Sequence, residues 1–328
     1  MHPRPGSRRR RPRSRTLPLT AALSAAAASA VVTAPSAGAG GYAAPSFAFT
    51  SDRDGDAEIF VRRTDGSLVK LTSNRIEDFE PAWSPDGRRI AFSRSAGAGY
   101  ALFVMDADGS NVRRLTPPVT TPDGEPSRDF TPDWSPDGSM VAFASNRGGG
   151  ESEVYRIDAD GTDLTRLTRT ESFVGDGNPT WSSSGRTIWF DSDRVGVFNV
   201  EVYRMNPDGT GVQRMTFTPN NVDDLAPDVS PDNRRVVFTS TRGDGEQDLW
   251  TMTPNGADAR RLTTASGLRE ETFPRWTADG AQVMYWTFRD PVRPTERIWR
   301  IDADGTDDRQ ITSGRFDDWS PDPYPVRR

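Results

Sequence analysis

The chain has 328 residues, of which 47 are acidic, 41 are basic, one is histidine and none is cysteine. The absence of cysteine excludes disulfide staples and thiol chemistry. The sole histidine is His2, within a segment that we expect to be removed. A Ser-His-Asp triad and histidine-ligated metals are therefore excluded from the remainder of the chain.

Residues 1–39 are predicted to be an export signal. Arginines without any acid precede a weakly apolar stretch, Leu17 to Val32, and Ala37-Gly38-Ala39 is a small-residue cleavage pattern. The stretch is too short and too weakly apolar for a membrane span. Arg8 and Arg9 suit a twin-arginine route, but the apolar residues expected soon after them are missing, so the general secretory route stays open. We expect export to the periplasm or the cell exterior.

The charge of the predicted mature chain bears on its partners. Seven arginines lie in the signal, so residues 40–328 keep 34 basic residues against all 47 acidic ones, a net charge of about −13. A field of that sign repels phosphate backbones and attracts small cations or basic protein surfaces. Nucleic acid is therefore not an expected partner, and we expect a soluble monomer without a membrane span.

The segment Pro-x-Trp-Ser-Pro-Asp-Gly recurs along the chain. It is complete at Pro81–Gly87 and Pro132–Gly138. Decayed copies follow at Pro179–Trp181, Pro227–Val229, Pro274–Trp276 and Asp317–Asp322. The aromatic positions are between 43 and 51 residues apart. A period of this length with several short strands in each unit predicts propeller blades rather than a helical solenoid.

Three further landmarks follow each copy. The first is a strand that is apolar on both faces, as expected between neighbouring blades: Phe47–Phe49, Ile90–Phe92, Val141–Phe143, Ile188–Phe190, Val236–Phe238 and Val283–Tyr285. The second is a strand that begins with an acid and ends with an aromatic, as in Glu58–Phe60 and Glu153–Tyr155. The third is a tight Asp-Gly or Asn-Gly hairpin before a last strand that ends in Leu-Thr or a close variant.

The two ends of the chain complement each other. The first unit lacks a Trp-Ser-Pro-Asp segment, and the last segment, Trp319–Asp322, has no unit after it. The C-terminus is therefore predicted to supply the innermost strand of a blade whose other strands start at Ser46, which removes open sheet edges. The predicted fold is an all-β, six-bladed propeller over residues 40–328, at about 48 residues per blade.

The repeat resembles the WD40-like propeller repeat of the TolB family over residues 46 to 322. The Pro-x-Trp-Ser-Pro-Asp-Gly segment, Ser51-Asp52-Arg53 and the Asp-Gly-x-x-x-x-x-Leu-Thr ending carry the resemblance. In the family that this repeat resembles, TolB itself is a two-domain periplasmic protein with a small α/β domain before the propeller. It works with the Tol envelope machinery and a peptidoglycan-associated lipoprotein. Here only the predicted signal precedes the propeller, so the resemblance implies the fold and a generic binding role.

The candidate binding residues form a ring of acids, one per blade, each three residues before the inner-strand proline: Asp78, Asp129, Asp176, Asp224 and Glu271. The first-to-second strand turns add Arg53, Arg147, Arg194, Arg242 and Arg289, with Arg94 offset in the second blade. The sixth acidic position is read as Gly314, with Asp317 and Asp318 close by. Two interpretations stay open: a structural girdle of ion pairs, or a channel-mouth funnel that binds a cation or a cationic peptide.

Two other features have alternative interpretations. Asp52, Asp54 and Asp56 resemble a fragment of a calcium loop, but the distal bidentate acid of such loops is not evident, so no cofactor is expected and calcium is a weak alternative. The tryptophans recur once per blade at one register, which favours core wedges over a sugar-stacking platform: Trp83, Trp134, Trp181, Trp276 and Trp319.

The sequence therefore predicts an exported, non-enzymatic binding scaffold for a protein or a cell-envelope component. The alternative is a carbohydrate-active enzyme or sugar-binding protein that uses channel-mouth carboxylates, because glycosidase chemistry needs only two of them. Pectate-type lyases on similar repeats are implied by the resemblance to hold their metal with histidines, which residues 40–328 lack.

Overall fold

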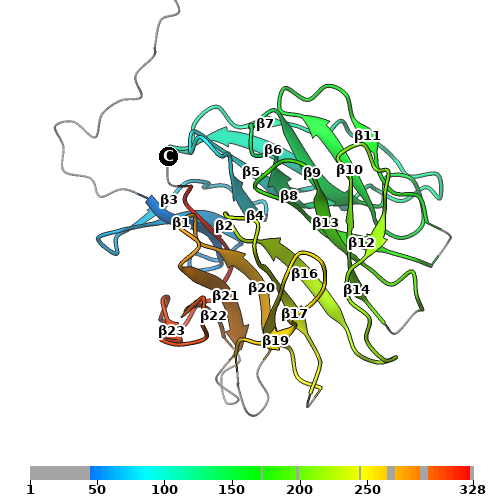
Figure 1. Cartoon of the computed structure of the whole chain (residues 1–328). Coiled ribbons are helices and arrows are strands. Elements are labelled where there is room, and N and C mark those ends of the chain that lie inside the picture. Colours follow the sequence, from blue (N-terminus) through cyan, green and yellow to red (C-terminus); the bar gives the residue numbers. More distant parts are fainter. Residues whose placement is uncertain are drawn as a thin grey trace, which may run out of the picture. The chain divides into compact units, whose positions relative to one another are not determined.

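The computed structural model describes residues 45–170, 173–196, 199–243, 245–263, 270–288 and 295–325. These residues form six four-stranded antiparallel sheets arranged as blades in a ring (Figure 1). The six-bladed all-β propeller predicted from the repeats is confirmed. The predicted signal, residues 1–39, lies outside the described residues. The described residues include no helix long and apolar enough to cross a bilayer.

Each blade runs from an inner strand at the channel to an outer strand at the rim. The first three blades comprise β24 (Asp318–Pro323), β1 (Pro45–Ser51), β2 (Glu58–Arg63) and β3 (Leu68–Lys70); β4 (Asp78–Trp83), β5 (Arg89–Ala96), β6 (Gly99–Asp106) and β7 (Arg113–Arg114); and β8 (Asp129–Trp134), β9 (Met140–Ser145), β10 (Glu153–Asp158) and β11 (Thr165–Arg166).

The other three blades repeat this order. They comprise β12 (Asp176–Trp181), β13 (Ile188–Ser192), β14 (Glu201–Met205) and β15 (Gln213–Arg214); β16 (Asp224–Val229), β17 (Val236–Ser240), β18 (Asp248–Met252) and β19 (Arg260–Arg261); and β20 (Glu271–Trp276), β21 (Gln282–Phe288), β22 (Glu296–Asp302) and β23 (Arg309–Gln310).

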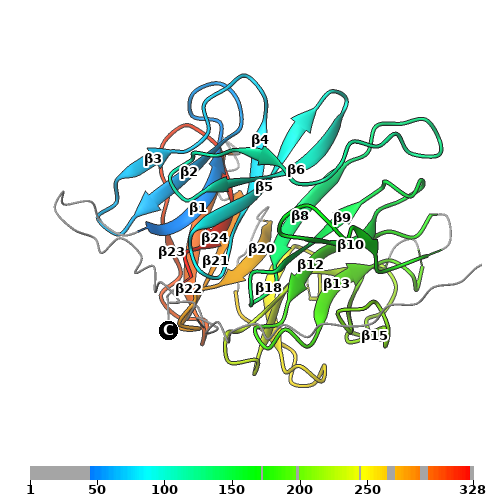
Figure 2. The same ribbon diagram turned by 90° about the horizontal axis from the view of Figure 1, so that it is seen from above.

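The ring is closed by the C-terminal strand, as predicted. β24 pairs antiparallel with β1, with Phe47 opposite Pro323 and Ser51 opposite Asp318. Figure 2 shows β24 beside β1 and the blades succeeding one another around the ring. Just beyond β24, the ring of Tyr324 packs edge-on against Trp83 at 4.9 Å between ring centroids. The C-terminal segment therefore joins the first blade to the second as well as completing the first.

The register of this last strand differs from the one predicted from the sequence, which placed the sixth acidic position at Gly314. Asp318, not Gly314, begins β24 and so holds the position that Asp78 holds in β4. Trp319 accordingly matches Phe79 rather than Trp83, and it is half-buried rather than a core wedge. The alignment failed because Trp-Ser-Pro-Asp occurs here four residues earlier in the strand than in the other blades.

The repeated motifs are explained by hydrogen bonds that recur from blade to blade. The hydroxyl of each closing threonine accepts the backbone N–H of the third strand, as Thr72 does from Ile59 at 2.9 Å and Thr312 from Ile298 at 3.0 Å. In the Ser-Pro-Asp-Gly turns the serine hydroxyl donates to the aspartate, as Ser84 does to Asp86 at 2.6 Å. The turn and strand ends are therefore satisfied internally.

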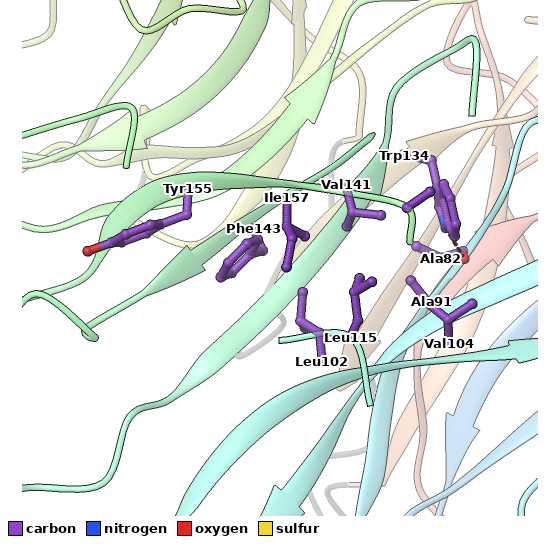
Figure 3. Packing of buried hydrophobic residues seen from close by; sticks show 11 residues of the cluster. Ala82, Ala91, Leu102, Val104, Leu115, Trp134, Val141, Phe143, Tyr155 and Ile157 are labelled. Carbon is purple, nitrogen blue, oxygen red and sulfur yellow. Dashed lines mark hydrogen bonds between the residues drawn. The ribbon is translucent and has the colours of Figure 1, made fainter. Parts of the chain in front are cut away.

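The core lies between successive blades. Trp134 is 5% exposed and packs with Ala82, Ala91 and Val104 of the preceding blade (Figure 3). Its indole N–H donates to the Ala82 carbonyl at 3.1 Å, which satisfies the one polar atom of this buried side chain. Trp83, Trp181 and Trp276 are also buried, which fits the expected role as wedges.

The antiparallel order gives the propeller two unlike faces. The face where the inner strands begin is here called the loop face. It carries the blade connections and the second-to-third strand hairpins, whose described residues include 71–77, 115–128, 167–170, 173–175, 215–223, 262–263, 311–317, 52–57, 97–98, 146–152, 193–196, 199–200, 241–243 and 245–247. The opposite turn face carries the Ser-Pro-Asp-Gly turns and the Asp-Gly hairpins. In those hairpins an aspartate accepts the N–H two residues on, as Asp108 does from Ser110.

Candidate functional site on the loop face

The predicted acidic ring begins the inner strands, but its carboxylates are buried. Asp78, Asp129, Asp176, Asp224 and Glu271 are each 0% exposed, and Asp318 is 1% exposed. Each aspartate is ion-paired with an arginine of the adjoining strand or turn. The pairs are Arg94–Asp78 at 2.5 Å, Arg147–Asp129 at 2.5 Å, Arg194–Asp176 at 2.7 Å, Arg53–Asp318 at 2.5 Å, and Arg242–Asp224. Arg289 lies outside the described residues.

The arginines are held by more than their carboxylates. Arg194 lies over the Tyr203 ring at 4.7 Å, Arg53 over the Phe60 ring at 4.8 Å and Arg94 over the Phe103 ring at 4.9 Å. Burial raises the pKa of Asp176 and Asp224 while their arginines lower it. Burial and ion pairing of these carboxylates favour the structural girdle of the two interpretations.

Arg94 lies on a strand rather than in a first-to-second strand turn, yet it also pairs with the acid that begins an inner strand. It lies directly opposite Asp78 in the β4–β5 ladder, where Ser145 stands opposite Asp129 in the next blade. Its Nε and Nη2 both donate to Asp78, at 2.5 and 2.7 Å. The longer β5–β6 hairpin therefore supplies the girdle arginine from the strand instead of from the turn.

Two of the three weak calcium candidates bind protein groups. Asp54 pairs with Lys70, and Asp52 Oδ1 accepts the Asp317 N–H at 2.8 Å. Within the part of the chain that the structure describes, no three acidic side chains are grouped so as to hold a metal ion. Asp52, Asp54 and Asp56 thus lie on one hairpin without converging on a common point.

The channel contains a second acidic layer that the sequence analysis missed. At the fifth position of alternate inner strands stand Asp133, Asp228 and Asp322. Each accepts the backbone N–H of the tryptophan that ends the inner strand of the next blade: Trp181 at 2.6 Å, Trp276 at 2.7 Å and Trp83 at 2.6 Å. An aspartate directly after the motif proline occurs in the sequence at Asp133 and Asp228, with one blade between them. Asp322 could not be matched to them because the register of β24 is shifted.

Burial raises the pKa of these channel carboxylates. Burial raises the pKa of Asp133 to about 7 and that of Asp322 to about 7, and it also raises the pKa of Asp228. The Arg275 guanidinium lowers all three pKa values and is the cation of this layer. Arg275 also lines a small cavity with Glu80, Thr131 and Phe273.

The exposed apolar residues gather on the loop face. Phe173 is 76% exposed and Phe217 is 75% exposed, and the loop-face residues Ile76, Val119 and Val195 are between 39% and 45% exposed. Among the described residues, the exposed large apolar residues of the turn face are Leu68, Val112 and Val212, each 40% exposed. The two prominent aromatic rings thus both belong to the loop face.

Comparison with known proteins agrees with this architecture. Residues 124–226 match the family described as the TolB beta propeller domain. The chain carries a TolB-like β-propeller. A "Protein TolB homolog" of Chlorobium luteolum is 28% identical to it over 152 residues, which are 46% of this chain and 32% of the relative. An uncharacterised protein of Agrobacterium fabrum is 30% identical over 145 residues, 44% of this chain and 46% of that protein.

Solved structures share the TolB-like fold. TolB from Acinetobacter baumannii superposes with a TM-score of 0.71 at 20% identity, over 86% of this chain and 66% of that chain. An oligogalacturonate lyase from Vibrio parahaemolyticus superposes less well, with a TM-score of 0.54 at 13% identity over 80% of this chain and 73% of that chain. The TolB-like chain spans less than half the length of the curated relatives named above.

Proposed function

We propose that this TolB-like propeller is an exported, non-enzymatic scaffold that binds a protein partner of the cell envelope through its loop face. Its curated relatives include proteins named for the Tol-Pal system. The basic segment and cleavage pattern within residues 1–39 support export. The net negative charge of residues 40–328 supports a partner with a basic surface.

The observation that carries the proposal is the position of Phe173 and Phe217. Each ring is at least 75% exposed, which is unusual for an aromatic side chain of a monomer without a binding role. Aromatic residues are enriched at protein interfaces and frequently anchor them. Because both rings stand on blade connections of one face, a partner that covers this face would bury them together with Ile76.

The carbohydrate-active alternative depends on accessible carboxylates. The girdle carboxylates are buried in ion pairs, so they do not serve as a general acid or a nucleophile without breaking those pairs. Asp133 and Asp322 have the raised pKa of an acid catalyst, but one oxygen of each accepts a hydrogen bond from a backbone N–H of the next blade. Binding by the loop face is therefore the better-supported function.

The experiment compares two faces of the same protein. A loop-face variant, Ile76→Ser with Phe217→Ser, is matched by a turn-face variant, Val112→Ser with Val212→Ser, whose residues are also exposed. Each is used to capture partners from envelope extracts, with wild type alongside, and the captured proteins are identified by mass spectrometry.

We expect one defined partner to be retained by the wild type and the turn-face variant and lost by the loop-face variant. Equal capture by all three proteins would overturn the proposed face. Turnover of a polysaccharide by the wild type would instead favour the enzymatic alternative.

A further inference from the structure

One blade connection departs strongly from the repeat. Between the closing threonine and the acid of the next inner strand, the connection from Thr116 to Asp129 is longer than those from Thr72 to Asp78 and from Thr216 to Asp224. It folds back on itself, because Thr121 and Glu125 close a turn through backbone and hydroxyl hydrogen bonds of 2.8 to 3.0 Å. A feature found in one blade is not required by the packing of all six, so it calls for another explanation.

The inserted turn meets a run of three glycines on the neighbouring hairpin. A Cβ at Gly148 would lie 2.4 Å from Arg166 Nη1, and one at Gly149 would lie 3.0 Å from Asp123 Oδ1. Gly149 and Gly150 also have φ of 82° and 77°, which favours glycine. The glycines let the hairpin backbone approach both Asp123 and Arg166 closely.

Between these segments lies an open cleft of about 430 Å³. Its walls come from the inserted turn, the glycine hairpin, the third and fourth strands of that blade, and the next connection. The charged lining residues are Asp123, Glu151, Glu153 and Arg166. Arg166 donates to Glu153 at 2.6 Å, and Thr170 also donates to Glu153 through its N–H. This leaves Asp123 and Glu151 as two exposed carboxylates without a cationic partner in the cleft lining.

Asp123 is anionic at neutral pH. Hydrogen bonds from its own backbone N–H and from the Gly150 N–H hold the pKa of its carboxyl below the usual value. The cleft lining therefore carries a net negative charge, because Arg166 is its one cation against three carboxylates.

Phe173 lies one residue before Val174, which lines the cleft, and its backbone is strained. Its φ is 78°, in the left-handed region that bulky residues avoid. The corresponding connection in the next blade shows what this position ordinarily requires. Thr170 and Thr218 make matching bonds, each hydroxyl donating to the carbonyl four residues on, Val174 and Val222.

In that sister connection the residue in place of Phe173 is Asn221, with φ of 67°. Asparagine adopts this conformation at a lower energetic cost than phenylalanine. The Phe173 ring is also 76% exposed, so burial does not offset the strain. An exposed aromatic residue kept in a costly conformation, next in sequence to a residue that lines an acidic cleft, points to a bound partner.

We propose that this cleft binds an arginine side chain of the partner polypeptide, with Asp123 and Glu151 pairing with the guanidinium and the Phe173 ring contacting its plane. The inference rests on the proposed protein-binding function and names one of its contacts. A guanidinium suits both parts of the site, since it forms charge-assisted hydrogen bonds to carboxylates and stacks on aromatic rings.

The test uses N-acetyl-arginine amide as the probe and its neutral citrulline analogue as the control ligand. Binding is followed by NMR on the ¹⁵N-labelled protein, through the amide signals of Gly148, Gly149 and Gly150. We expect saturable shifts at these amides with the arginine probe, and affinity about tenfold lower for citrulline, the change expected when a charge-assisted contact is lost.

Three variants sharpen the test. Asp123→Asn with Glu151→Gln should abolish the saturable shifts, whereas Glu125→Gln, an exposed carboxylate of the same insertion outside the cleft lining, should leave them unchanged. Phe173→Asn introduces the residue type that stands at Asn221 in the next blade. It should weaken binding of the probe several-fold, while the melting temperature stays level or rises because backbone strain is relieved.

The outcomes separate this inference from the broader function. Absent shifts, equal binding of citrulline, or full binding by the Asp123→Asn, Glu151→Gln variant would each overturn the arginine site. If the arginine probe binds at the glycines but no envelope partner depends on the loop face, the site stands and the proposed function fails. If a partner is captured but the probe does not bind, the partner engages the loop face elsewhere.

Discussion

The inner-strand layer and the loop face of this propeller follow opposite rules. In the inner layer most blades are alike: the aspartates at the first position of five inner strands pair with arginines, and tryptophans stand at the last position of β4, β8, β12 and β20. On the loop face the blades differ: its described residues include one long insertion, one run of three glycines and two exposed aromatic residues. What repeats in every blade holds the ring together, and what appears once is available for recognition.

The largest expected effect comes from removing the strand that closes the ring. Deleting residues 317–328 removes β24 and exposes the pairing edges of β1, together with the Tyr324 contact to Trp83. We expect cooperative loss of the whole fold, measured by thermal melting with circular dichroism. A truncated protein that melted within a degree or two of the wild type would show that the inner layer does not depend on closure.

The next effect concerns a repeated position within the core. Trp134→Ala removes a ring that is 5% exposed and packed between two blades, and it should lower the free energy of unfolding by about 3 to 5 kcal/mol. Denaturant unfolding measures this directly. An unchanged midpoint accompanied by loss of ligand binding would instead assign the tryptophans to recognition.

A smaller effect arises from the channel carboxylates and depends on pH. Because the folded pKa of Asp133 is raised from 3.8 to about 7, its neutral form stabilises the fold below pH 3.8, and that contribution is lost as pH rises through about 7. Asp322 behaves in the same way. Asp133→Asn with Asp322→Asn keeps oxygen acceptors for the tryptophan N–H groups and removes the charge.

The double variant should therefore melt above the wild type at pH 8, and the difference should vanish near pH 4. Melting curves of both proteins across this range provide the measurement. A difference that grew as the pH fell would mean that the carboxylates are stabilised as anions.

The smallest expected effect is that of a chelator. The girdle acids are neutralised by arginines, so EDTA should leave the melting temperature unchanged. A drop in melting temperature that added calcium restored would place a stabilising cation in the fold and would overturn arginine compensation.

The sequence predicted the parts of the molecule that repeat. Blade number, strand order, closure by the C-terminus and the burial of Trp134 all follow from motifs that occur once per blade, since each copy reports the same packing. The register of β24 did not follow, because Trp-Ser-Pro-Asp occurs there at another position of the strand. The motif alone gave no way to detect the shift.

The candidate site was harder to predict for a physical reason. The acids and arginines were visible, but whether a carboxylate faces solvent or an arginine depends on strand register and burial. The strain at Phe173 depends on a backbone angle that the sequence does not display, and the likeness of its connection to that of Asn221 appears only in their hydrogen bonds. The cleft joins segments from separate hairpins, so no single motif marks it.

Denaturant unfolding of two double variants tests the contrast between the layers most directly. Asp129→Asn with Asp176→Asn leaves Arg147 and Arg194 without their carboxylates, and we expect a loss of about 3 to 5 kcal/mol in the free energy of unfolding. Phe173→Asn with Phe217→Ser changes only exposed loop-face residues, and we expect the unfolding midpoint to stay level or rise. The reverse result, a stable girdle variant and an unstable loop-face variant, would contradict the account.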